Sequence, residues 1–261
     1  MARFVVGLSL SLFVASFVVA QNPPVSDPRA LTLAAQSIAA MTGGNALSDI
    51  TLTGNVTWIA GSDIQTGIGN FLAKGTSQSR VDLTLSGGNR SDIRNSSSGF
   101  PQGAWIRNGT SIAYALHNCW TDAAWFLPAL TSLSASDPSI VLSYVGLENR
   151  FGLSAHHLRA YRYVSSQSNQ VTAQTQRLST MEFYLDRASL LPLAVAFKVH
   201  PDNDMDTDIR AEVRFADYRA VNGVLVPFHI QRLVNDGLFL DVTLTSAAVN
   251  SGLPDSNFTV Q

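Results

Sequence analysis

Cysteine is almost absent from this chain of 261 residues, in which Cys119 is the only one. A single thiol cannot close a disulfide within the chain, so no disulfide framework holds the fold. Two roles stay open for Cys119, a small buried apolar group or a reactive thiol. Its neighbours Asn118 and Trp120 carry no positive charge that would stabilise a thiolate, which favours the buried role.

The sequence also lacks an excess of basic residues. Its 17 Lys and Arg are outnumbered by 19 Asp and Glu, which gives a formal net charge of −2 at pH 7. Proteins that bind nucleic acid normally carry a basic face or stripe. We therefore expect no nucleic acid among the partners.

Long apolar runs are missing except at the N-terminus. Arg3 precedes an apolar stretch from Phe4 to Val19, and Val18-Val19-Ala20 places small residues at the −3 and −1 positions of a cleavage site. This pattern predicts a signal peptide over residues 1–20, removed near Ala20. The run is shorter than the roughly 20 residues that span a bilayer. We expect a periplasmic or secreted protein that does not span the membrane, with residues 21–261 forming a single domain of all-β size.

Motifs for catalysis, cofactors and zinc are missing too. The sequence contains no G-x-S-x-G, no G-x-x-x-x-G-K, no His-x-x-x-His and no Cys-x-x-Cys. The adjacent His156 and His157 would point to opposite faces of a strand and could not easily share an ion. We therefore predict no cofactor, no metal and no catalytic residue, and a non-enzymatic protein. A Ser-His-Asp triad is a spatial arrangement, so a secreted hydrolase stays as the least favoured alternative.

Four aspartates at every second position, Asp202 to Asp208, resemble the start of a calcium-binding loop. Counted from Asp202, the sixth residue is Thr207 instead of Gly and the twelfth is Val213 instead of Glu. This departure excludes an EF-hand. A looser calcium site and a solvated hairpin tip both stay open, and the hairpin tip is favoured.

What the chain does contain is alternation of apolar and polar residues, above all between Ile209 and Leu244. Three successive segments place apolar side chains on every second position: Ile209, Ala211, Val213 and Phe215; Val224, Val226, Phe228 and Ile230; Leu238, Leu240, Val242 and Leu244. Asn222-Gly223 and Asn235-Asp236-Gly237 lie between them, and such residues supply the positive φ of tight hairpin turns. The pattern predicts an antiparallel meander with one apolar face.

The same alternation recurs along most of the chain. In addition to the three strands of the meander, strands are predicted at 50–59, 67–74, 81–85, 104–106, 112–116, 139–147, 156–164, 180–185 and 193–199. So many strands favour a strongly curled sheet. One amphipathic helix precedes them, capped by Asp27, begun by Pro28 and ended by Gly43-Gly44. Residues 165–176 are predicted to be a polar loop or hairpin tip.

The segment from Thr121 to Leu133 is the most apolar stretch outside the strands. Pro128 lies inside it, which predicts short or kinked helical turns in place of one straight helix. Two interpretations stay open, a helix that packs into the core and a lid over an apolar cavity.

Two segments resemble a known family. The ending FADYRAVNGVLVPFHIQRL, followed by LFLDVTLTSAAVNSGLPDSNFTV, combines Tyr218, the Asn222-Gly223 turn and Pro227-Phe228 with Asn250 and a closing Leu253, Pro254 and Phe258. The stretch YVGLENRFGLSAHHLRAY holds the hairpin from Gly146 to Gly152. Together with the secretory signal and N-terminal helix, they resemble the LolA-like superfamily of periplasmic lipoprotein carriers and their uncharacterised secreted relatives.

The resemblance implies a mainly β fold, in which a curled antiparallel sheet forms an incomplete barrel with an N-terminal helix and a short helical lid. It also implies that the concave face holds a lipid, a lipoprotein acyl group or another apolar ligand. No residue signature for lipoprotein handover is recognised. The alternative is an envelope sensor or scaffold domain of the same fold that binds a protein partner. From alternation we infer these ligand-binding residues: Trp125, Phe126, Leu130, Phe183, Phe197, Phe215 and Phe228.

Overall fold

The structure is a computed structural model that describes residues 24–98, 100–121, 123–127, 137, 139–165 and 168–260. The expected signal peptide and Leu130 lie outside this part of the chain. The elements are α1 (Pro28–Thr42), β1 (Asp49–Ala60), β2 (Asp63–Lys74), β3 (Gln78–Leu85), β4 (Gly88–Asn95), β5 (Gln102–Arg107), β6 (Thr110–Ala113), η1 (Leu116–Cys119), β7 (Ile140–Arg150), β8 (Leu153–Arg162), α2 (Asn169–Ser179), β9 (Met181–Asp186), β10 (Pro192–Val199), β11 (Ile209–Val221), β12 (Val224–Val234), β13 (Gly237–Val249) and η3 (Asp255–Phe258).

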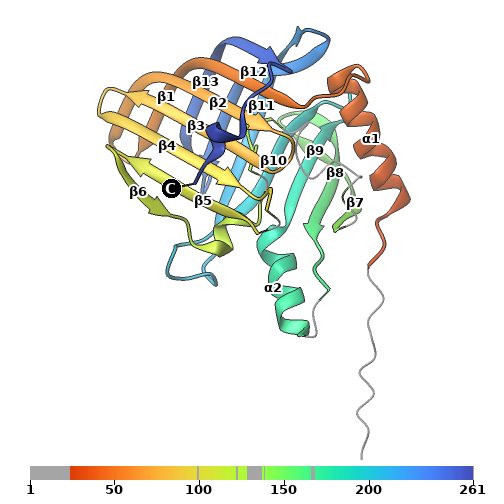
Figure 1. The fold of residues 1–261 in the computed structure, drawn as a ribbon. Helices are drawn as coiled ribbons and strands as arrows, with labels where there is room; N and C mark the ends of the chain where they lie inside the picture. Colours follow the sequence, from red (N-terminus) through yellow and green to blue (C-terminus); the bar gives the residue numbers. More distant parts are fainter. Residues whose placement is uncertain are drawn as a thin grey trace, which may run out of the picture.

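Thirteen strands form one antiparallel sheet in the order β6-β5-β4-β3-β2-β1-β13-β12-β11-β10-β9-β8-β7. The first and last strands pair with each other, so the two halves of the chain meet in the middle of the sheet. β6 and β7 are its two edges, and the sheet curls without closing (Figure 1). The expectation of a mainly β, unclosed barrel is thereby confirmed. In the described part of the chain, no helix is both long and apolar enough to cross a bilayer.

One strand of the sheet, β4, was not predicted from the sequence. Gly87-Gly88-Asn89-Arg90 looked like a turn, but Gly88 is the first residue of a strand that pairs with both β3 and β5. Arg90, Asp92 and Arg94 occupy alternate positions of this strand. Charged residues on one face conceal the alternation that apolar residues would reveal.

Helix α1 begins and ends where the sequence predicts. The Asp27 carboxylate accepts a hydrogen bond from the Arg29 amide at 2.7 Å, and Gly43 ends the helix with a φ of 61°. This positive φ is a conformation that glycine adopts without steric cost. The helix contacts both β12 and β7, which lie far apart in the sheet order. It therefore bridges the inner face of the curled sheet and buries Leu33 and Met41 there.

Helix α2 corrects the prediction of a polar loop over residues 165–176. The Ser168 side chain caps the helix and accepts a hydrogen bond from the Val171 amide at 3.5 Å. Only Thr175, Leu178 and Ser179 are buried in it. One leucine among polar residues gives too weak a helical period to detect, so contact with β8 stabilises a helix that pattern alone could not reveal.

The C-terminal hairpins and the lone cysteine agree with the sequence. Asn222 and Gly223 have φ angles of 48° and 82°, and Asn235 and Asp236 have φ angles of 47° and 63°. These are the positive φ values that tight two-residue turns require. Cys119 is 5% exposed, and burial raises the pKa of its thiol. Of the two open roles, the buried apolar one is confirmed.

The outer face of the sheet carries a buried histidine between two carboxylates. His157 Nδ1 lies 2.5 Å from Glu148, and His157 Nε2 lies 2.7 Å from Glu182. Burial alone would lower the pKa of His157, but hydrogen bonds to Glu182 and Glu148 outweigh it and raise that pKa. The neighbouring His156 instead lies near Tyr144, as expected for adjacent residues that point to opposite faces.

This arrangement predicts a pH-dependent contribution to stability. A raised pKa in the folded state stabilises the fold below the unfolded value of about 6.5, and the effect is lost as the pH rises through the folded pKa. His157→Gln should therefore lower the melting temperature more at about pH 5.5 than at about pH 9, with a cost on the order of 1 kcal/mol at the lower pH. Glu182→Gln should shrink the same pH dependence. A difference between wild type and His157→Gln that does not vary with pH would contradict the assignment.

Candidate ligand-binding site

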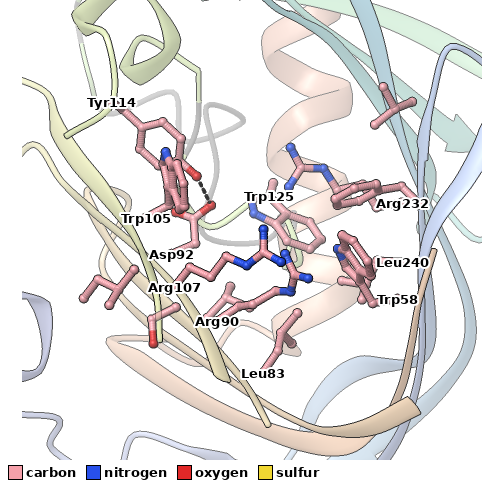
Figure 2. A pocket seen from close by; sticks show the side chains of 15 residues that line it. Trp58, Leu83, Arg90, Asp92, Trp105, Arg107, Tyr114, Trp125, Arg232 and Leu240 are labelled. Atoms are coloured by element: carbon pink, nitrogen blue, oxygen red, sulfur yellow. Dashed lines mark hydrogen bonds between the residues drawn. The ribbon is translucent and has the colours of Figure 1, made fainter. Parts of the chain in front are cut away.

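A cavity of about 270 Å³ lies on the inner face of the sheet, between β3, β4 and β5 on one side and β12 and β13 on the other (Figure 2). Its lining is mainly apolar and aromatic, with few polar groups. The lining residues are Trp58, Val81, Leu83, Arg90, Ser91, Asp92, Trp105, Ile106, Arg107, Tyr114, Trp125, Arg232, Val234, Phe239 and Leu240. A largely apolar hollow with a few convergent polar groups is typical of small-molecule sites.

Aromatic rings build the walls of the cavity. Trp58 packs edge-to-face on Phe239 with ring centroids 5.8 Å apart, and it lies opposite Leu240 across β1 and β13. Trp105 faces Asp92 across β4 and β5. Trp125 comes from the chain after η1 and packs on Phe71 at 6.3 Å. These rings come from segments far apart in sequence that the curl of the sheet brings together.

Three arginines point into this apolar hollow (Figure 2). Arg90 on β4 and Arg107 on β5 are direct partners across the two strands. The Arg90 guanidinium lies 3.9 Å from the Trp58 ring centroid, and that of Arg232 lies 4.8 Å from the Trp125 ring centroid. Burial and the charge of Arg107 lower the pKa of Arg90, and burial lowers the pKa of Arg232.

One carboxylate, that of Asp92, accompanies the three arginines. It accepts a hydrogen bond from the Tyr114 hydroxyl at 2.7 Å. Burial and the nearby Asp92 charge raise the pKa of Tyr114 well above its usual value, so the phenol stays protonated and donates. The cavity therefore carries positive charge within a protein whose net charge is negative.

A second cavity of about 300 Å³ adjoins the first and shares Asp92, Tyr114, Trp125 and Arg232 with it. Its other lining residues are more polar: Arg94, Asn118, Phe197, Val199, His200 and Asp202. Trp125 and Arg232 thus stand between two hollows.

His200 closes the polar end of the second cavity. It is 5% exposed, and its Nε2 lies 3.0 Å from Asp208. Its Nδ1 is buried and has no hydrogen-bond partner. Burial lowers the pKa of His200.

The acidic run is engaged within the protein. Asp208 contacts Lys198, Arg177 and His200, and Asp204 accepts hydrogen bonds from the Asp206 and Thr207 amides. Within the part of the chain that the structure describes, no cluster of three or more His, Cys, Asp or Glu is arranged to hold a metal ion.

The predicted ligand-binding residues fall into three groups. Trp125 lines both cavities, and Phe197 lines the second one. Four others are packed in the core and are not among the residues that line either cavity: Phe126, Phe183, Phe215 and Phe228. Leu130 lies outside the described residues. That these side chains contact a ligand stays a prediction.

Sequence reasoning missed the arginines and most of the aromatic wall. A signal for Arg232 was present, because the inward series Val226, Phe228 and Ile230 continues directly to it at the next alternate position. A charge in an apolar series is a site where a buried polar role should be considered. The pairing of Arg90 with Arg107 depends on the register of β4 against β5, which cannot be read from the sequence.

Comparisons with known proteins identify the fold. No protein-family model matches the sequence, and a comparison with curated proteins finds no significant match. A domain named as an outer membrane lipoprotein-sorting protein from Vibrio parahaemolyticus is similar at 12% identity, with 88% of this chain and 96% of that chain covered and a TM-score of 0.57. A DUF1329 family protein from Desulfovibrio piger is similar at 12% identity, with 91% and 100% covered and a TM-score of 0.57.

A third solved structure carries the family name itself. It is a LolA superfamily protein from Nitrosomonas europaea, similar at 11% identity, with 88% of this chain and 97% of that chain covered and a TM-score of 0.50. Identities this low establish the architecture and leave the activity to the residues of the site. The chain therefore has the LolA-like fold that its N-terminal helix and C-terminal meander predicted.

Proposed function

We propose that this protein is an exported, non-enzymatic carrier or binding protein for a lipid, a lipoprotein acyl chain or another apolar ligand, which it holds inside the curled sheet. One observation supports this above all: the inner face is not completely filled by the protein, because an aromatic-walled cavity of about 270 Å³ remains there. Each methylene buried there would contribute about 0.8 kcal/mol.

Helix α1 divides the inner face of the sheet into a covered part and an open part. The helix covers the half of the sheet that runs from β12 to β7, where Phe183 and Phe215 are packed with its apolar side chains. The cavity lies between β3, β4 and β5 on one side and β12 and β13 on the other, and none of its lining residues comes from α1. The ligand is therefore proposed to occupy the part that α1 leaves open, and Trp125 to flank it.

Trp105→Ala tests this assignment with little risk to the fold. Trp105 lines the cavity but is only partly buried on β5, next to the edge strand β6. We expect the variant to bind a fluorescent fatty-acid probe about tenfold more weakly, a loss of about 1.4 kcal/mol that matches one lost aromatic contact. Fluorescence titration of the purified protein measures it.

Trp120→Ala is the matched control. Trp120 is also partly buried but is not among the lining residues of the cavity. Its replacement should leave the affinity for the probe within about twofold of wild type. Equal loss in both variants, or no saturable binding by the wild type, would argue against the carrier function.

A second function, binding of an envelope protein as a sensor or scaffold, is favoured by a different surface. The hairpin of β7 and β8 lies at a sheet edge and exposes four apolar side chains: Val145, Leu147, Phe151 and Leu153 are 46% to 49% exposed. Exposed edge strands with apolar side chains are surfaces that pair with other chains. Under this function, Leu147→Glu weakens partner binding and leaves binding of the lipid probe unchanged.

A further inference from the structure

The arginines of the cavity differ from most others in the protein in having no carboxylate partner. Eight arginines elsewhere form ion pairs with Asp or Glu: Arg80, Arg150, Arg159, Arg162, Arg177, Arg210, Arg214 and Arg219. Among the described residues, no carboxylate lies within the 4.0 Å ion-pair distance of Arg90, Arg107 or Arg232. The sequence supplies enough acidic groups to pair them, so the missing partners are a local feature of the cavity.

Arg90 and Arg107 repel each other. They are direct partners across antiparallel strands, an arrangement that destabilises a sheet when both side chains carry the same charge. The only lining carboxylate, Asp92, already accepts the Tyr114 hydroxyl. The charge of Asp63 acts on Arg90 only from beyond ion-pair distance, so a negative charge bound between the two guanidinium groups would relieve the repulsion.

Arg232 leaves a donor unsatisfied on the opposite wall. Its Nε is buried and has no hydrogen-bond partner. The guanidinium lies 4.8 Å from the ring centroid of Trp125 and 5.9 Å from that of Phe239. A buried donor without a partner destabilises the unliganded protein, and an acceptor bound in the cavity would satisfy it.

We propose that the cavity selects an anionic amphiphile, whose carboxylate or phosphate is bound by Arg90, Arg107 and Arg232 and whose apolar body lies on the tryptophan walls. The planar guanidinium fork matches both oxyanions and can bind them through two parallel hydrogen bonds. This inference rests on the proposed function and narrows it to ligands with a negatively charged head group.

Calorimetric titration of the purified protein with three probes of equal chain length, decanoate, decyl phosphate and 1-decanol, tests the inference. We expect both anions to bind at least about tenfold more tightly than the alcohol. Added salt should weaken the binding of the two anions and leave the binding of the alcohol unchanged. The anion that binds more tightly, decanoate or decyl phosphate, identifies the preferred head group. Equal affinity for all three probes overturns anion selection and leaves the carrier function standing, whereas absence of saturable binding by any probe overturns both.

Substitutions assign the selectivity to the arginines. The double variant Arg90→Gln with Arg107→Gln should lose at least about tenfold in affinity for the anions and stay within about twofold for decanol. Its melting temperature should be equal to or above that of the wild type, because the repulsion is removed. Arg187→Gln, which removes an exposed arginine outside the cavity, is the charge-matched control. An equal loss in the control, or an unchanged anion affinity in the double variant, overturns the assignment.

Discussion

Glu212→Gln should lower the stability of the protein by about 2 to 4 kcal/mol, which corresponds to a fall of about 5 to 15 °C in melting temperature for a chain of this size. Three arginines converge on this one carboxylate on the outer face of the sheet. Arg214 Nε lies 2.7 Å from Oε1, Arg210 Nη2 lies 2.9 Å from Oε2, and Arg150 also contacts Oε2. Glu212 is itself only 2% exposed.

The large effect has a structural cause. Arg150 is the last residue of the edge strand β7, and its guanidinium lies 4.1 Å from the Tyr184 ring centroid on β9. Its contact with Glu212 on β11 therefore fastens the β7–β8 hairpin across the outer face. Removal of the carboxylate charge leaves a partly buried arginine uncompensated, which costs more than the pair itself contributes.

The contacts of Glu212 with its arginines also predict a loss of stability in acid. Burial would raise the pKa of Glu212, but Arg214 and Arg150 outweigh it and lower that pKa. A lowered pKa stabilises the fold above the unfolded value of about 4.3, and the effect is lost as the pH falls through the folded pKa. Thermal melts from neutral pH downward should show the wild type converging on Glu212→Gln only in that acidic range.

Asp236→Asn supplies the control for this prediction. Asp236 pairs with Arg210 at 3.1 Å, but its side chain is 72% exposed. Its replacement should change stability by less than about 0.5 kcal/mol. If Glu212→Gln melted no lower than Asp236→Asn, the carboxylate would not be the centre of the network.

Trp125→Ala should have the second large effect, a loss of about 3 to 5 kcal/mol in stability together with weaker ligand binding. The side chain is 5% exposed and packs edge-to-face on Phe71 and Phe126, at 6.3 Å and 5.5 Å between ring centroids. It also lies beneath Arg232 and lines both cavities. Its removal merges two hollows and takes away the aromatic surface between them.

Two measurements separate the packing effect of Trp125 from the binding effect. Trp125→Phe should recover part of the stability, because a smaller ring still fills much of the space. Affinity for the fatty-acid probe, measured well below the melting temperature, should fall by about tenfold or more in Trp125→Ala. Trp120→Ala should change neither quantity appreciably. A Trp125→Ala variant that melts lower but binds the probe as the wild type does would place Trp125 in the core alone.

The sequence predicted the parts of the fold that depend on local chemistry. The Asp27 cap, Pro28 and Gly43 define the bounds of α1, and Asn222-Gly223 places a tight turn where the structure has one. Each of these residues acts through its own backbone preference or a neighbour a few positions away. By contrast, α2 has a single buried leucine, and its existence depends on contact with β8.

The candidate site was only partly predictable for the same reason. Alternation correctly placed Phe183, Phe215 and Phe228 on the buried side of their strands. It could not tell which part of that side α1 would cover, because the helix contacts β7 and β12, which are distant in sequence from it. Trp125 was singled out by its apolar surroundings, and it is the residue of the predicted set that lines both cavities.

By itself, the sequence determined that this protein is a curled antiparallel sheet with one apolar face and an N-terminal helix, since alternation, caps and turn residues act over a few positions of the chain. Only the tertiary structure decided that Arg90 lies opposite Arg107, and that Arg232 faces the same hollow from β12. Strand register and the curl of the sheet bring these charges together across more than a hundred residues. The charge of the cavity is therefore a property of the folded sheet and not of any one segment.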